Sequence, residues 1–259
     1  MAALVSTMGV ALARANATWL DWGFGYVSHG RVALAEAEGT LWQGSGRLVL
    51  VDVVAQRDAS QQSRGAEIQR SSLNGVAVPG RVSWRLNPWP LFLGQMDLAL
   101  RLDGMDHDIT VRGGRQDVAV SEGKLSLPAV DLSRLGSPWS TLRPSGALAM
   151  KWEALTFRNN GFDGKAQIEL REASAAISPI NPVGSYRVDL SGQGSDTGVV
   201  LSTLQGPLRL SGTGRFNART GFSMNAEAIA DESERLRLQS MLGLIGRREG
   251  DKIIIKIGA

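Results

Sequence analysis

The chain has 259 residues, of which 43% are apolar and 20% are charged. This composition excludes a disordered chain and leaves room for one long all-β domain or two smaller ones. The net charge is only +3 without a basic stripe among aromatic residues, which argues against a nucleic-acid partner, and the lack of cysteine excludes disulfides and zinc–thiolate sites.

The first 28 residues are expected to be a separate N-terminal segment. Residues 1–13 are apolar but shorter than the roughly 20 residues that span a bilayer, and no basic residues precede them as in a secretory signal. They are interpreted either as a short amphipathic helix or as the tail end of a membrane helix, and residues 14–28 are interpreted as a further helix. Residues 1–28 are therefore assigned to a residual membrane anchor or N-terminal helix, and residues 29–259 to a β-rich domain.

The rest of the chain repeats one local pattern, in which a glycine precedes strict alternation of apolar and polar residues. Such alternation predicts half-buried antiparallel strands. In residues 42–50 the apolar face also carries Trp42, Gly44 and Gly46, and glycines on such a face indicate sharp curvature or close backbone approach. Strands with one apolar face are expected at 42–50, 81–86, 96–103, 124–127, 147–152, 165–171, 186–190, 199–204, 207–216 and 252–257.

Few helices are expected between these strands. Residues 56–72 are polar and predict a long loop or an edge, while residues 88–94 and 129–136 predict short turns. The best helix is expected from about Asp231 to Arg248, with Asp231 as its N-cap and acidic residues in its first turn.

Many strands with an apolar face and few helices to cover them limit the possible folds. One sheet does not leave a whole apolar face in water, so it must curve around its own interior or bind something apolar. The expected fold is mainly β: an elongated, strongly curved antiparallel sheet, trough-like or partly closed, with few helices, one of them C-terminal.

The sequence offers no convincing catalytic or metal-binding group. His107 lies between two aspartates, but neighbouring strand residues point to opposite faces, so a polar turn explains the triplet better than a metal site. The Asp196-Thr197-Gly198 tripeptide resembles that of aspartic proteases, but it also has the composition of a hairpin turn. We expect no catalytic residue, no metal, no cofactor and no enzyme activity.

Six segments, spread from about Trp19 to Gly258, resemble one known family in their order and spacing. They are GRVALAEAEGTLWQGSGRLVL, PGRVSWRLNP, KLSLPAVDLSRLGSPWSTLRPSGALAMKW, SPINPVGSYRVDLSG, LSTLQGPLRLSGTGRF and LRLQSMLGLIGRREGDKIIIKIG. The chain resembles the type II secretion system protein N family, also called general secretion pathway protein N. The resemblance implies a non-enzymatic component of the Gram-negative envelope, held on the periplasmic side of the inner membrane, that supports export of folded proteins across the outer membrane.

The resemblance implies other type II secretion proteins and the inner membrane as partners. The expected membrane helix is incomplete or missing in this chain. Trp89 and Trp139 are flanked by prolines and are candidate exposed partner contacts.

The alternative hypothesis is a lipid-binding or lipid-transfer envelope module, with phospholipid as its partner and acyl chains in the concave face of the sheet. The candidate residues lining such an apolar groove lie on the apolar faces of the expected strands: Trp42, Leu48, Val82, Trp84, Leu98, Leu100, Leu148, Trp152, Ile168 and Leu210. An open trough would favour this alternative, and a sealed barrel would not.

Overall fold

A computed structural model of the chain describes residues 32–51, 75–77, 79–131, 144–158, 161–217 and 219–258. The expected segment 1–28, its helix, the polar stretch 56–72 and Trp139 lie outside these residues. The expected turn at 129–136 lies partly outside them, and its first three residues belong to a strand.

The described chain is an antiparallel sheet with few helices, as the alternating sequence predicted. Its first half contains these elements: β1 (Val32–Gly39), β2 (Gln43–Val51), β3 (Gly75–Ala77), β4 (Val82–Leu86), α4 (Pro88–Leu91), β5 (Met96–Leu102), β6 (Ile109–Gly113), β7 (Asp117–Val120), β8 (Gly123–Asp131) and β9 (Pro144–Trp152). The second half contains these: β10 (Leu155–Arg158), β11 (Gly161–Ala175), β12 (Gly184–Gln193), β13 (Asp196–Gln205), β14 (Leu208–Asn217), β15 (Gly221–Ala230), the 3-10 turn η2 (Glu232–Glu234), α6 (Arg235–Ile245), β16 (Arg247–Glu249) and β17 (Lys252–Ile257).

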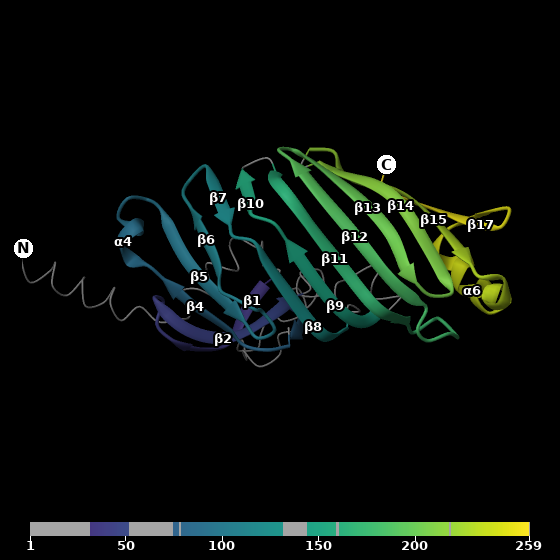
Figure 1. The fold of residues 1–259 in the computed structure, drawn as a ribbon, viewed down its shortest axis with the longest axis horizontal. Coiled ribbons are helices and arrows are strands. Elements are labelled where there is room, and N and C mark those ends of the chain that lie inside the picture. Colours follow the sequence, from purple (N-terminus) through teal and green to yellow (C-terminus); the bar gives the residue numbers. More distant parts are fainter. Residues whose placement is uncertain are drawn as a thin grey trace, which may run out of the picture.

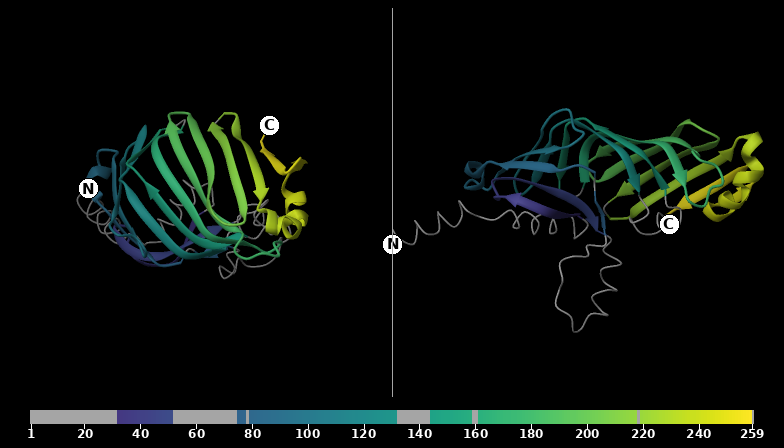
Figure 2. Two further views of the ribbon diagram at one scale, coloured as in Figure 1. Left: turned by 45° about the vertical axis from the view of Figure 1, so that its right-hand side comes forward. Right: turned by 90° about the horizontal axis from the view of Figure 1, so that it is seen from below.

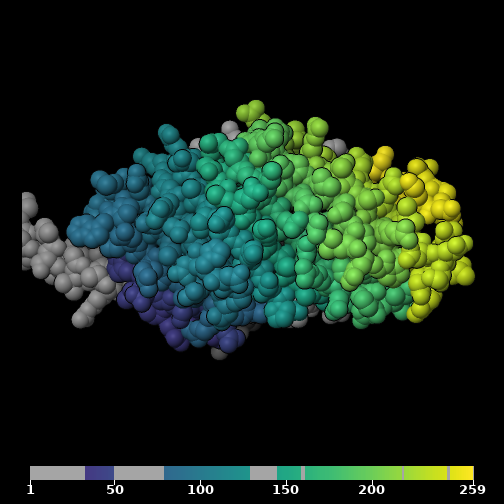
Figure 3. Space-filling view, viewed as in Figure 1, coloured from purple at the N-terminus to yellow at the C-terminus, as the bar shows by residue number. Residues whose placement is uncertain are grey.

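The strands form one open sheet that branches at β11. From β11 one arm runs through β12, β13, β14, β15 and β17 to β16. On the opposite edge of β11, the residues at its start pair with β10. From β10 a second arm runs through β7, β6, β5, β4 and β2 to β1. The remaining residues on that edge of β11 pair with β9, and β9 pairs in turn with β8. The pairings do not close the sheet, and the elongated body has α4 at one end and α6 at the other (Figures 1 and 3).

A bulge in β11 bends the sheet and changes which residues face inward. Glu172 has a positive φ of 49°, and both neighbouring ladders shift register around it. Its N–H donates to the Ser185 hydroxyl oxygen at 3.0 Å. Because one extra residue reverses the alternation, Leu170 is followed on the apolar face by Ala173, which is buried.

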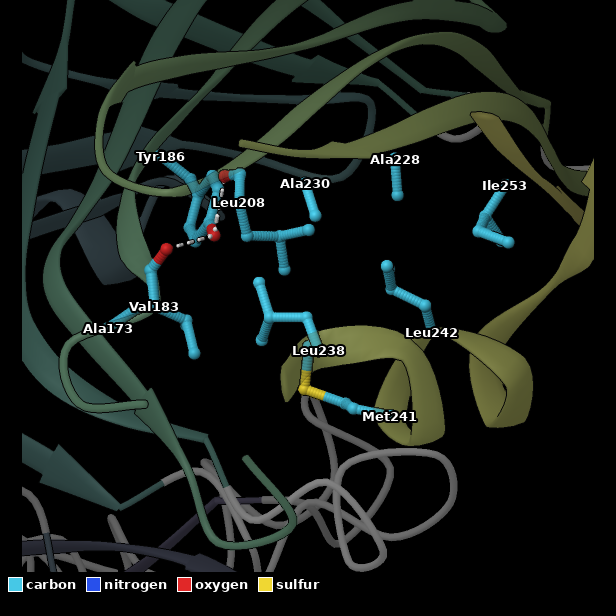
Figure 4. Close-up of a cluster of buried hydrophobic side chains, with 10 residues drawn as sticks. All are labelled: Ala173, Val183, Tyr186, Leu208, Ala228, Ala230, Leu238, Met241, Leu242 and Ile253. Carbon is cyan, nitrogen blue, oxygen red and sulfur yellow. Dashed lines mark hydrogen bonds between the residues drawn. The ribbon is translucent and has the colours of Figure 1, made fainter. Parts of the chain in front are cut away.

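Two clusters of buried side chains lie at the two ends of the sheet. The C-terminal cluster consists of Ala173, Val183, Tyr186, Leu208, Ala228, Ala230, Leu238, Met241, Leu242 and Ile253. Figure 4 shows its side chains pointing from the curved strands towards α6, whose Leu238, Met241 and Leu242 face the sheet. The N-terminal cluster consists of Leu34, Val82, Trp84, Leu86, Leu98 and Leu102, from β1, β4 and β5.

The C-terminal helix is present but shorter than predicted, and its predicted cap is wrong. α6 begins at Arg235, after η2, and Arg247 and Arg248 belong to β16. The Asp231 side chain makes no capping bond; it accepts a hydrogen bond from Arg209 Nη2 at 2.6 Å instead. Within the described part of the chain, none of the helices has the length and apolarity needed to cross a bilayer.

Candidate functional site

The register of the strands places apolar side chains on one continuous face of the sheet. One row of directly opposed residues crosses eight strands without a polar member: Leu125, Met150, Ile168, Val188, Leu201, Gly212, Ala226 and Ile255. Successive strand residues point to opposite faces, so all eight share one face. Figure 2 shows the strands arching, and Figure 4 shows cluster side chains and α6 on the inner side, so this apolar face is the concave one.

The middle of this apolar face lies between the two clusters. Leu201, Leu210 and Ile255 pack against the C-terminal cluster, and Leu125 packs against the N-terminal cluster. Met150, Ile168 and Val188, from β9, β11 and β12, belong to neither cluster and are only half-buried. This half-buried part of the concave face, here called the trough floor, can accept an apolar ligand or a partner's apolar side chains.

Phenylalanines extend the apolar face to one rim of the sheet. Phe157 lies opposite Phe162 at the β10–β11 hairpin, and Phe216 lies opposite Phe222 at the β14–β15 hairpin. Phe157, Phe216 and Phe222 are exposed. The concave face therefore has an apolar edge as well as an apolar floor.

Tryptophans on this face pack over glycines of the neighbouring strands. Trp84 lies opposite Gly44, and a Cβ added at Gly44 would overlap the Trp84 ring. Trp152 likewise covers Gly123. Trp84 Nε1 donates to the Thr40 carbonyl at 3.1 Å, and Trp152 Nε1 donates to the Ser121 carbonyl at 2.9 Å. The glycines thus permit the close approach expected from residues 42–50, and the bonded indoles fix the rings against them.

The ten candidate groove residues fall into three groups. Val82, Trp84 and Leu98 are buried members of the N-terminal cluster, and Trp42, Leu48 and Leu100 pack against that cluster. Leu210 packs against the C-terminal cluster. The half-buried residues in neither cluster are Leu148, Trp152 and Ile168. Val82, Trp84 and Leu98 are thus core, the other seven are half-buried, and those that pack against neither cluster lie on β9 and β11.

The opposite face of the sheet is polar and carries a fork of ion pairs around Glu169. Both oxygens of this nearly buried carboxylate are bonded, one to Arg171 Nη2 at 2.8 Å and the other to Arg187 Nη2 at 2.9 Å. The hydrogen bond from Arg171, with that from Arg187, holds the pKa of Glu169 below its ordinary value, although burial acts in the other direction. Sequence alternation placed these residues on the polar face but did not indicate the fork.

Of the two tryptophans predicted to be exposed contacts, Trp89 is described and is 77% exposed. It lies in α4, where its N–H donates to the Asn87 side-chain oxygen. The neighbouring Leu91, Phe92 and Leu93 are exposed too, which the sequence reading of a short turn missed. The sequence did contain a signal for this exposure: residues 87–95 are uncharged and include two prolines, and a tight turn leaves little room to bury four large side chains.

The motifs that suggested chemistry lie in ordinary strands and turns. Asp196 opens β13, and its carboxylate accepts a hydrogen bond from Asn217 Nδ2 at 2.9 Å. His107 is exposed, with Nε2 3.3 Å from the Glu122 carbonyl oxygen. Among the described residues no cluster of three or more His, Asp or Glu side chains could hold a metal ion.

Comparisons with known proteins place the chain in a family. No curated protein and no solved structure shows significant similarity to it. The model of the family described as type II secretion system (T2SS), protein N, matches residues 30–254, a span that includes nearly every described strand. The chain therefore belongs to the type II secretion system protein N family and is a component of that secretion system.

Proposed function

We propose that this secretion component is a non-enzymatic, inner-membrane-associated protein whose β-rich domain, residues 29–259, lies in the periplasm. Residues 1–28 would contribute the membrane-anchoring segment. The domain would support export of folded proteins across the outer membrane by binding other proteins of the secretion system. The observation that carries this proposal is the family match over residues 30–254.

The described structure offers surfaces suited to such binding. β16 covers only Lys252–Ile254 of β17, so the outer edge of Ile255–Ile257 extends beyond the ladder. An extended segment of a partner could add to a strand edge of this kind through backbone hydrogen bonds. The exposed Phe216 and Phe222, at the neighbouring β14–β15 hairpin, add apolar contact area near this edge.

The test combines secretion with cross-linking in cells. Deleting the gene should retain folded substrates in the periplasm, and restoring the full chain should release them. A photoreactive residue at Ile257 should cross-link to another secretion protein, while one at Arg115, at the other end, serves as the positional control. Normal secretion after deletion, together with no secretion protein among the cross-linked products, would overturn the proposal.

A second candidate function is holding phospholipid acyl chains on the concave face. The row from Leu125 to Ile255, with a half-buried centre on β9, β11 and β12, favours it. Side chains of this kind would contact methylene groups, at about 0.8 kcal/mol for each one removed from water.

Native mass spectrometry of the full chain, purified without detergent, tests this second function. The wild type should carry mass increments of phospholipid, and Val188→Gln, which places an amide on the apolar face, should lose them. Val200→Gln is the matched control, because Val200 lies on the adjacent strand with its side chain on the polar face, 47% exposed. Absence of lipid from the wild type, or equal occupancy in both variants, would reject lipid binding.

A further inference from the structure

The loop between β4 and β5 presents a compact set of exposed apolar side chains. Trp89, Phe92 and Leu93 are 77%, 79% and 80% exposed, and Leu91 is exposed beside them. The rings of Trp89 and Phe92 lie 6.1 Å apart, so they form one patch. The loop lies at the end of the elongated body opposite α6 (Figure 1). Exposed apolar side chains gathered in this way mark a contact surface.

Most backbone N–H groups of this loop are hydrogen-bonded within the loop itself. The N–H groups of Phe92, Leu93 and Gly94 donate to carbonyls of the same turn, at 3.3, 3.0 and 3.0 Å, and that of Gln95 donates to the Pro90 carbonyl at 2.9 Å. The Trp89 N–H donates to Asn87, and the two prolines have no N–H. A backbone paired in this way can leave water at low cost, as entry into a lipid interface requires.

The side-chain chemistry of the loop matches a lipid interface better than a protein surface. Residues 87–95 contain no charged group, and the only side-chain donor between Pro88 and Gly94 is the Trp89 indole. Tryptophan is enriched where apolar chains meet lipid headgroups. Gly114, in the β6–β7 turn, lies against the Gly94 carbonyl, and that turn carries one exposed cation, Arg115, and one exposed anion, Asp117, near the uncharged loop.

We propose that the α4 loop, Asn87–Gln95, inserts Trp89, Phe92 and Leu93 into the interfacial layer of a lipid bilayer. This contact would fix the N-terminal end of the curved sheet at a membrane surface and leave the α6 end away from it. The inference goes beyond the proposed function and does not depend on it, because it rests on the loop alone.

The test uses the cysteine-free chain to report position. Leu93→Cys in the full chain is labelled with an environment-sensitive NBD dye, and Leu236→Cys is the matched control, since Leu236 is 84% exposed on α6 at the other end. The probe is vesicles of phosphatidylethanolamine with a minor fraction of phosphatidylglycerol. At position 93 the dye should brighten, shift to shorter wavelength and be quenched by spin-labelled lipid, whereas at position 236 it should not respond.

A second measurement separates insertion from other binding to the same vesicles. In the chain that carries the dye at position 93, replacing Trp89 and Phe92 together by serine should lower the dye's response to lipid by about tenfold or more, even where residues 1–28 keep the chain on the vesicles. Leu236→Ser should leave it unchanged, and near-ultraviolet circular dichroism confirms that both variants are folded. Equal dye responses at positions 93 and 236, or an unchanged response at position 93 after the two serine replacements, would overturn the proposal.

Discussion

Leu238 on α6 gives the sharpest test of how the curved sheet is closed at its C-terminal end. Its side chain is 0% exposed and lies between the helix and the strands of the C-terminal cluster (Figure 4). Leu238→Ala removes three carbons, which corresponds to about 2.4 kcal/mol of transfer free energy at about 0.8 kcal/mol each. The cavity left behind raises the expected loss of unfolding free energy to about 3–4 kcal/mol.

The assay is thermal unfolding followed by circular dichroism. For a domain of this size each kcal/mol lowers Tm by about 2–4 °C, so Leu238→Ala should lower it by about 6–16 °C. Leu236→Ala, two residues away on the exposed side of the same helix, should change the unfolding free energy by no more than about 0.5 kcal/mol. Similar Tm values for the two variants would show that α6 does not pack on the sheet and would refute the reasoning.

Two further predictions concern the sheet itself. Gly44→Ala should lower the unfolding free energy by about 1–3 kcal/mol and shift tryptophan fluorescence, because the new Cβ would overlap both the Glu38 carbonyl oxygen and the Trp84 ring; Gly198→Ala, where the nearest atom is 3.8 Å away, should change neither. Glu169→Gln should cost about 1–2 kcal/mol at neutral pH, since the arginine partners are partly exposed. Because the folded pKa of Glu169 is lowered, its stabilisation is present above the unfolded pKa and is lost as pH falls through the folded value. Urea midpoints of wild type and variant should therefore converge in acid, and a constant gap at all pH values would contradict the ion-pair explanation.

The faces of the strands could be predicted from the sequence because side-chain alternation is a local property of extended backbone. Trp42, Gly44 and Gly46 were read correctly as a face that needs close packing, and the structure shows the Trp84 ring against Gly44. The bulge at Glu172 could not be predicted in this way. The consecutive charged residues Arg171 and Glu172 break the alternation there, but such a break also fits the end of a strand, and the bulge depends on pairing with two neighbouring strands at once.

The sequence also could not predict which of the candidate site residues are buried. Val82 and Ile168 have the same alternating surroundings, yet Val82 is buried in the N-terminal cluster and Ile168 is half-exposed on the trough floor. The difference arises because β1, β2, β4 and β5 fold against one another at their end of the sheet, a long-range arrangement. The Glu169 fork is similar, since Arg187 reaches it across the β11–β12 pair.

The sequence alone determined that this protein is built from one-sided strands with too little helix to cover them, and its ordered segments indicated the secretion family. The strands follow from short-range alternation that each stretch carries by itself, and the family follows from the order and spacing of the segments along the chain. The tertiary structure decided where the sheet branches, which part of its apolar face becomes core and which part stays accessible, and that Trp89, Phe92 and Leu93 project together. These outcomes depend on which strands become neighbours, and the free energy of burial is set by those neighbours and not by the residue type.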